Sequence, residues 1–435
     1  MNRFLYSLLL YLLSPIIWIY FACRGLKDPR YWRDLVERLG YVSKDISKNR
    51  LTRSKCIHIH CASVGESRAV IPFTESLGVN YPEVLLLITS TTPTGRNVIN
   101  KLIRETQSAP AKKNILVCYL PIDWPGACKR FLETIKPSLC VFMETELWPN
   151  LIHQIESKSI PIFLANARMS DASMKKYLNH SQLSTPMFAS LTHIAAQYEA
   201  DKKNYLALGC EENRISVVGN VKFDINISNK LRHEQQTLRK LWSADRPCWI
   251  AASIHPEEFN TIIDSHQQML NNIPNLLLIA VPRHSERFSE LKNQCKKRRI
   301  KFVNRTENSS PTKDQSVVIG DTMDEMMLLF GAADVAFIGG SLIERGGHNP
   351  IEAAACGLPV VMGPSVYNFA TVCQLMEDDG SLTRIEKGQQ LVKVITTLLS
   401  HSEDLQEKRQ AARKTIAKLS GSIDKQTSIM QNLCL

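Results

Sequence analysis

The sequence lacks the short signatures of several common protein classes. None of its 12 cysteines forms a CxxC pair, and the one Cys/His cluster, Cys56–Cys61, has no second ligand pair at zinc-finger spacing. We interpret that cluster as part of a buried strand. No Asp-x-Asp triplet occurs, which disfavours metal-dependent sugar transfer. The glycine-rich dinucleotide fingerprint is missing after the first strand, which argues against a dehydrogenase. Aromatic residues are not interleaved with basic runs, so a nucleic-acid partner is not expected.

The composition is that of a globular protein with a basic surface. The 435 residues are 44% hydrophobic and 22% charged, which is enough for two ordinary domains. The formal net charge of +11 indicates an anionic partner or surface. Most cysteines fall in apolar segments, which is typical of buried free thiols in a reducing compartment.

The N-terminus contains an uncharged run from Phe4 to Cys23. A helix of this length spans about 30 Å, the thickness of a bilayer core. The run ends without a small-x-small cleavage site, and residues 23–55 are rich in Lys and Arg. We therefore predict an uncleaved membrane anchor over residues 1–23, with the body on the cytoplasmic side. Pro15 is expected to bend it, and a segment that dips into one leaflet is the alternative. A buried soluble helix is disfavoured by the tyrosines and tryptophan near the ends.

After residue 55, apolar runs of strand length alternate with amphipathic helical patterns. Continuous apolar strands between helices indicate parallel sheets covered on both faces. A polar stretch over 226–245 divides the pattern, so we expect an α/β domain at 24–225 and another at 226–435, which ends in a charged helix. The predicted strands are Ile57–Cys61, Val84–Thr89, Ile115–Leu120, Ser138–Met143, Ile160–Ala165, His193–Gln197, Ser216–Val218, Trp249–Ser253, Leu276–Val281, Ile300–Val303, Val317–Ile319, Val335–Ile338 and Val360–Met362.

Ligands in such sheets bind beyond the carboxyl ends of the strands, where the first half carries several charged residues. Glu66 stands at a probable helix start, where it is either a general base or an acid favoured by the helix dipole. Glu144 and Glu146 are two residues apart and resemble a cation-chelating pair. Lys222 follows the last strand of this half, where it could stabilise developing negative charge.

The second half has a glycine-rich segment, Gly339–Gly363, that joins a strand to a helix start. This arrangement predicts free backbone N–H groups for a nucleotide phosphate. Pro350 fits the first helical turn, and Glu352 would reach a ribose hydroxyl. Arg283 directly follows another strand, as a phosphate clamp would.

Taken together, these motifs resemble those of the Kdo (3-deoxy-D-manno-octulosonic acid) transferases, and the resemblance covers nearly the whole chain. The matching segments are the N-terminal anchor, His60–Glu66, Thr92–Gly95, Glu144–Asn150, Asn166–Arg168, Gly219–Asp224, Pro282–Arg287, Gly320–Glu325 and Gly339–Glu352. The resemblance implies a GT-B fold of two Rossmann-like domains facing a cleft, with the acceptor in 24–225 and CMP-Kdo in 226–435. It also implies inverting, metal-independent transfer of one or more Kdo residues to a lipid A precursor at the inner membrane, with no cofactor.

The resemblance also assigns roles to residues. Glu66 would be the general base, and Glu144 and Lys222 would stabilise the transition state. The expected CMP contacts are Pro282, Arg283, Met323, Asp324, Glu325, Asn349, Pro350, Ile351 and Glu352. Asp324 stands where the family usually has Gly, and His255-Pro256-Glu257 departs from the usual His-x-Gly-Glu pattern. The rival interpretations are a GT-B enzyme for another nucleotide sugar and a membrane-bound nucleotide-binding scaffold.

Overall fold

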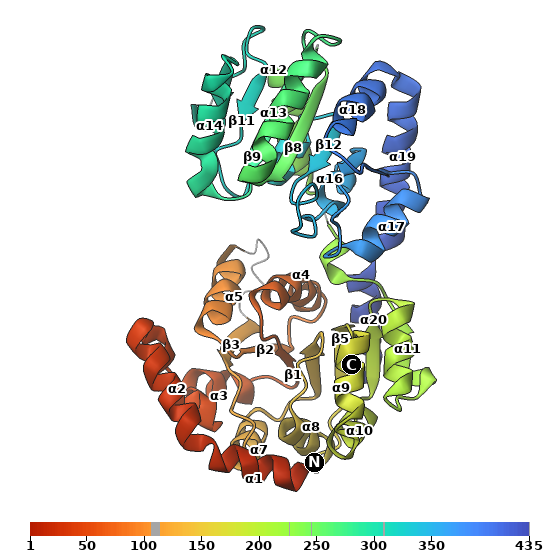
Figure 1. The fold of residues 1–435 in the computed structure, drawn as a ribbon. Helices are drawn as coiled ribbons and strands as arrows, with labels where there is room; N and C mark the ends of the chain where they lie inside the picture. Colours follow the sequence, from red (N-terminus) through yellow and green to blue (C-terminus); the bar gives the residue numbers. More distant parts are fainter. Residues whose placement is uncertain (106–113, 226, 245, 308, 435) are drawn as a thin grey trace. The chain divides into compact units, whose positions relative to one another are not determined.

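The computed structural model describes residues 1–105, 114–225, 227–244, 246–307 and 309–434 (Figure 1). The chain forms two compact units. Unit 1 comprises Met1–Asp224 and Gly421–Leu435, and unit 2 comprises Ile225–Ser420. Each unit is built around one parallel sheet with helices on its faces (Figure 1). The predicted doubly wound α/β architecture is therefore confirmed.

The sheet of unit 1 has the strand order β3-β2-β1-β4-β5-β6-β7, and every neighbouring pair is parallel. Its strands are apolar runs buried on both faces, as the continuous hydrophobic pattern predicts. The strands are β1 (Cys56–His60), β2 (Leu85–Ser90), β3 (Ile115–Tyr119), β4 (Leu139–Met143), β5 (Ile162–Ala167), β6 (His193–Ala196) and β7 (Ile215–Val217). His58 and His60 lie inside β1, and both hydrogen-bond the Thr89 hydroxyl of β2 at 2.8 and 3.0 Å. The Cys/His cluster is therefore structural.

The sheet of unit 2 has the order β10-β11-β9-β8-β12-β13-β14, also parallel throughout. The strands are β8 (Cys248–Ile254), β9 (Leu277–Pro282), β10 (Phe302–Asn304), β11 (Val317–Ile319), β12 (Val335–Ile338), β13 (Val360–Met362) and β14 (Leu382–Arg384). Every strand except β14 was predicted; only Leu382 of its three residues is apolar, so this segment carries no apolar run.

The helices between these strands begin and end as follows. Unit 1 contains α1 (Arg3–Leu12), α2 (Ser14–Lys27), η1 (Pro29–Trp32), η2 (Leu35–Leu39), α3 (Lys44–Leu51), α4 (Val64–Asn80), α5 (Pro93–Glu105), α7 (Pro125–Ile135), α8 (Pro149–Glu156), α9 (Asp171–Leu178), α10 (Ser181–Ala189), α11 (Glu199–Ala207), η3 (Glu212–Arg214), η4 (Val221–Phe223) and α20 (Ser422–Cys434). Unit 2 contains α12 (Asn229–Ser243), α13 (Pro256–Leu270), η5 (Ser285–Arg287), α14 (Phe288–Lys297), η6 (Arg305–Glu307), α15 (Met326–Phe330), α16 (Ile351–Ala355), α17 (Ala370–Asp378), α18 (Gln390–Ser400) and α19 (Ser402–Leu419).

The predicted single anchor helix is instead a pair of helices, α1 and α2, that meet at a 52° bend. Pro15 lies in the first turn of α2. Proline has no N–H to donate and its ring clashes with the preceding turn, so helix α1 ends before it. Among the described residues no single helix has the length and apolar content of a membrane span, although this bent pair passes that test as a unit. One face of the pair docks on unit 1: Ser7 donates to Asn150 at 2.9 Å, and the Tyr11 ring stacks on Trp124 at 5.9 Å.

The end of the chain returns to unit 1, which corrects the expected 226–435 boundary. The charged helix ends at Leu419, and Gly421, with φ of +88°, turns the chain into α20. Met430 of α20 is buried in the core of unit 1 with residues of β1, β2 and α4, since the apolar face of α20 covers that sheet. The last helix therefore belongs to the first domain in space, although it follows the second domain in sequence.

Candidate active site

Each sheet reverses its strand order at one point, and several of the predicted site residues follow the strands at that point. In unit 1 the order reverses between β1 and β4, and in unit 2 between β8 and β12. Loops leave the sheet in opposite directions at such a point, so the strand ends border a crevice where ligands bind. Glu66 and Glu144 follow the two strands at the first reversal, and the Gly339 loop follows β12 at the second.

Glu66 lies in the first turn of α4, where Ser63 caps its backbone N–H and its own carboxylate binds the backbone of Ala62. The Ser63 hydroxyl accepts from the Glu66 backbone N–H at 3.1 Å, and Glu66 Oε2 accepts from the Ala62 N–H at 2.8 Å. The side chain is only 5% exposed, so its orientation is fixed. The structural role considered from sequence is thus present, and it occupies one carboxylate oxygen.

Glu144 and Lys222, which are far apart in sequence, form an ion pair with 2.8 Å between Glu144 Oε1 and Lys222 Nζ. Glu144 has φ of +56°, a left-handed conformation that a glutamate adopts at a cost and that is common at functional sites. The Lys222 ammonium lies 4.0 Å from the Cβ position of Gly65, next to the start of α4. The structure therefore brings Glu144, Lys222 and the Glu66 turn together within unit 1.

Glu146 is the third carboxylate of this group, and it was predicted only as half of a chelating pair. Burial raises its pKa, and the neighbouring charges of Glu66 and Glu144 raise it further. Such a shift indicates that the three acids share one site. Among the described residues, no group of three His, Cys, Asp or Glu side chains has the arrangement to hold a metal ion.

In unit 2, the predicted CMP contacts lie on three loops at the strand ends. Arg283 directly follows β9, and its side chain is exposed. Glu325 is held by Arg305 through two bonds, Nε to Oε2 at 3.1 Å and Nη2 to Oε1 at 3.0 Å. The guanidinium of Arg305 in turn lies over the Trp242 ring. Asn349 caps α16 by accepting from the Ile351 N–H at 3.0 Å.

Asp324 adopts φ of +61°, which explains why a glycine suits this position. The left-handed region is strained for residues with a Cβ, and Asp is among the few that tolerate it. The backbone geometry of this loop is thus compatible with the substitution, and the exposed Asp324 carboxylate adds a negative charge beside Glu325.

The prediction of free N–H groups along the Gly339 loop is wrong for the residues that begin it. The buried Glu258 carboxylate accepts from the N–H groups of Gly340 at 2.9 Å, Leu342 at 3.2 Å and His255 at 3.0 Å. These donors are therefore satisfied inside the protein. Gly339 has no room for a side chain, because a Cβ there would meet the Ser253 carbonyl oxygen at 2.5 Å.

Sequence reasoning missed the role of Glu258, although a signal was present. His255 and Glu258 are three residues apart around Pro256, which is the spacing of a capping box at the start of α13. Burial raises the pKa of Glu258, while its N–H donors oppose that shift. Glu258 thus fixes the start of the glycine loop from inside the protein through the hydrogen bonds that it accepts.

A cluster of Arg283 with His255, His284 and His348 lies beside this loop. His255 and His348 share a hydrogen bond between their Nε2 atoms at 2.9 Å, and His284 packs edge-on against His255. Burial lowers the pKa of His348 to about 4, and the nearby Arg283 charge lowers it further. Both imidazoles are therefore neutral at pH 7. Protonation of the accepting Nε2 would place two N–H donors face to face. An anion that binds to this part of unit 2 would therefore contact the exposed Arg283 and the polarised imidazoles.

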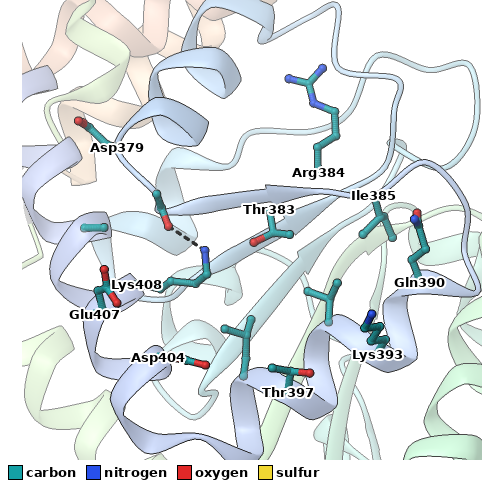
Figure 2. Close-up of a pocket in the computed structure, with 14 residues that line it drawn as sticks. Asp379, Thr383, Arg384, Ile385, Gln390, Lys393, Thr397, Asp404, Glu407 and Lys408 are labelled. Atoms are coloured by element: carbon teal, nitrogen blue, oxygen red, sulfur yellow. Dashed lines mark hydrogen bonds between the residues drawn. The ribbon is translucent and has the colours of Figure 1, made fainter.

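A separate cavity of about 590 Å³ lies in unit 2 between the edge strand β14 and helices α18 and α19 (Figure 2). Lys408 donates to the Gly380 carbonyl oxygen at 3.0 Å at one side of it (Figure 2). None of the predicted donor-binding residues lines this cavity, so it is not the predicted nucleotide site.

Comparisons with known proteins agree on family and fold. Residues 33–225 match the family model of 3-deoxy-D-manno-octulosonic-acid transferase (kdotransferase), and residues 260–415 match that of glycosyl transferases group 1. A 3-deoxy-D-manno-octulosonic acid transferase of Haemophilus influenzae is 36% identical, covering 99% of this chain and 98% of that protein. One from Bordetella pertussis is 30% identical, with 97% of each covered.

The solved structures are similar in fold alone. A glycosyltransferase from Rickettsia africae has a TM-score of 0.57 at 12% identity, covering 87% of this chain and 98% of that one. The UDP-GlcNAc 2-epimerase of Neisseria meningitidis has a TM-score of 0.55 at 13% identity, covering 84% and 100%. The predicted GT-B fold class is thereby confirmed.

Proposed function

The chain belongs to the Kdo transferase family, and we propose that unit 1 holds a lipid A precursor while unit 2 holds CMP-Kdo. It is a glycosyltransferase of lipopolysaccharide core biosynthesis that uses CMP-Kdo as its donor. The observation that carries the division of roles is the meeting of Glu66, Glu144 and Lys222 at the strand reversal of unit 1. An acid group beside an ammonium suits proton removal from an acceptor hydroxyl.

In this proposal, Glu66 is the general base. Its Oε2 is engaged by Ala62, and among the described residues no donor to Oε1 is seen, so that oxygen is available to take the acceptor proton. Because Ala62 and Ser63 fix the carboxylate, little reorganisation is needed when the acceptor binds. A single base is enough for an inverting displacement, since CMP leaves with its charge held in unit 2.

Glu144 and Lys222 act on the charge that develops during transfer. Glu144 holds the ammonium beside the start of α4, where the helix dipole is also positive. A fixed positive charge at this point stabilises the negative charge that develops on a reacting oxygen in the transition state. The strained backbone of Glu144 is consistent with such a positioning role.

Unit 2 supplies the donor site in the proposal. Arg283 meets the CMP phosphate, because a charge-assisted bond from an exposed guanidinium is among the stronger phosphate contacts. The segments Met323–Glu325 and Asn349–Glu352, together with Pro282, contact the nucleoside. Glu325 and Asn349 are already fixed by Arg305 and by the α16 cap.

We also assign the bent α1–α2 pair to the cytoplasmic face of the inner membrane. Its outward residues are exposed and apolar, as shown by Phe4 at 77%, Leu12 at 66% and Ile16 at 62%. Replacing these three by Ser should release the protein from vesicles containing anionic lipid. Deletion of residues 1–23 is a poorer test, because the buried Asp123 would lose its hydrogen bond from Tyr6.

The deciding experiment incubates the purified protein with CMP-Kdo and a tetraacyl lipid A precursor and measures the mass of the glycolipid. We expect the addition of one or more Kdo residues and no product with UDP-hexoses. Binding of CMP without any transfer would favour the scaffold interpretation. Product from a UDP-hexose would favour the rival donor.

A further inference from the structure

The loop that carries Lys222 is held by residues from the other end of the chain. Gly219–Asp224 follows β7, and the Asn220 side chain accepts from the Lys222 backbone N–H at 3.0 Å. The Lys222 side chain is half exposed and flexible, so the position of its backbone decides whether its ammonium reaches Glu144.

Helix α20 reaches this loop through two buried side chains, Ser422 directly and Gln426 by way of Asn166 of β5. Ser422 donates its hydroxyl proton to the Gly219 carbonyl oxygen at 3.0 Å and accepts from Gln426 Nε2 at 2.9 Å. Gln426 Oε1 accepts from the Asn166 backbone N–H at 2.8 Å. Gln426, Ser422 and Asn166 are all 0% exposed, so water cannot replace these bonds.

Asn166 completes the connection to Lys222. Its backbone is left-handed, with φ of +50°, and its Oδ1 accepts from the Val221 N–H at 3.1 Å. Its carbonyl accepts from Gln197, which in turn binds Asn220 at 2.9 Å. The two residues that precede Lys222 are therefore held by Asn166, Val221 directly and Asn220 through Gln197.

The two points where the chain passes between the units also meet here. Asp224 is the last residue of the first segment of unit 1, and Gly421 is the first residue of the second. The Asp224 carboxylate accepts from the backbone N–H groups of Gly421 and Ile423. The start of α20 is thus fastened to the residue that ends the Lys222 loop.

We propose that Gln426 is a positioning residue for transfer, acting through Asn166 and the 219–224 loop to hold the Lys222 ammonium on Glu144. The inference rests on the proposed role of Lys222. The proposal adds helix α20, which follows unit 2 in sequence, to the residues that support the role of Lys222. Gln426 touches no substrate, so its effect should appear in turnover and not in donor binding.

The test compares Gln426→Met with Thr427→Val in the full-length protein. Methionine keeps the length of the side chain and removes both hydrogen bonds. Thr427 is the neighbouring residue on α20, equally buried, and its hydroxyl has no partner among the described residues. We expect Gln426→Met to lower kcat roughly 10- to 100-fold, the scale of a small misplacement, with KM for CMP-Kdo unchanged. Thr427→Val should retain wild-type values.

Combination with Lys222→Met separates positioning from general damage. If Gln426 acts through Lys222, then Gln426→Met lowers kcat no further in the Lys222→Met background. A loss of the same factor in both backgrounds overturns the inference. Full activity of Lys222→Met overturns the proposed role of Lys222, which is a distinct result. If Gln426→Met does not fold, Ser422→Ala, which removes the bond to Gly219, takes its place, and wild-type kcat in that variant also overturns the inference.

Discussion

The two units share one architecture but place opposite charge where their strand order reverses. Unit 1 gathers the carboxylates Glu66, Glu144 and Glu146 around a single lysine. Unit 2 places Arg283 near the His255–His348 pair, and the Glu258 carboxylate beside them is buried and hydrogen-bonded. The sheet therefore provides the location, while the residues that end each strand decide the chemistry.

The difference fits a reaction between a neutral hydroxyl and an anionic donor. Proton removal requires a carboxylate that is held but not neutralised, and phosphate binding requires cations. In the proposal, the base and the phosphate-binding arginine belong to different sheets. If this division holds, a change in one unit should affect either proton removal or phosphate binding, but not both.

The largest effect is expected in unit 1. Glu66→Gln keeps the acceptor for the Ala62 N–H, so the cap and the fold should remain. Transfer should fall by two or more orders of magnitude, the scale that general-base catalysis supplies. Initial rates with CMP-Kdo, together with CMP binding by calorimetry, measure both properties.

Glu75→Gln on the same helix is the matched control and should retain activity. A near wild-type rate for Glu66→Gln would remove it as the base and leave only its capping role. Reduced CMP affinity in that variant would contradict the separation of the two units.

The second effect belongs to unit 2. Arg283→Ala should weaken CMP binding by roughly 10- to 150-fold, because a charge-assisted contact contributes about 1.5–3 kcal/mol. Arg287→Ala is the control, since Arg287 lies on the same loop but pairs with Glu290 at 3.2 Å. Equal CMP affinity of the two variants would exclude Arg283 from the donor site.

The parts that the sequence predicted well are those with a local signal. Apolar runs located the strands, Pro15 indicated the bend, and residues directly after strands pointed to the site. The Glu144–Lys222 contact could not be derived from spacing, because its two residues lie on different strand ends and meet only in the folded sheet. Only a shared role for the two residues in stabilising the transition state was expected, and that expectation came from the family resemblance.

The errors have a physical reason as well. The Gly339 loop has the composition of an anion site, but the carboxylate of Glu258 already fills part of it from another element. Helix α20 was assigned to the second domain because sequence order was the only guide. Its return to unit 1 depends on tertiary contacts such as Met430, which no periodic pattern specifies.

A third prediction concerns acid, where the two units should behave alike. Burial lowers the pKa of His58 to about 3 and of His60 to about 4 in unit 1, and the pKa of His348 to about 4 in unit 2. Below the unfolded pKa of about 6.5, the unfolded chain takes up protons that the folded chain does not. Stability is therefore complete above pH 6.5 and falls toward pH 4.

The loss should reach about 2 kcal/mol by pH 5 for each of the fully buried His58 and His60, and less for His348, whose partial exposure screens its charge. Thermal unfolding followed between pH 7.5 and 5 measures it, and a constant melting temperature over that range would contradict it. A loss restricted to one unfolding transition would show that only one unit depends on its neutral histidines.

The smallest effect is expected at Asp324, which adds an exposed negative charge to the unit that is proposed to bind the phosphate. Glycine relieves a left-handed strain of about 1 kcal/mol, but it also gains about 0.5–1 kcal/mol of unfolded-state entropy. Asp324→Gly should thus change stability by less than about 1 kcal/mol, whereas Asp324→Ala keeps the strain and should be the least stable. Removing the exposed negative charge should strengthen CMP binding by no more than about fivefold, the limit for an exposed charge pair.

Asp324→Asn separates the two causes, because asparagine tolerates the left-handed backbone without the charge. If Asn matches Gly in CMP affinity, the charge is responsible. If only Gly improves binding, the side chain itself obstructs the backbone contact, and the departure from glycine weakens the donor site through shape.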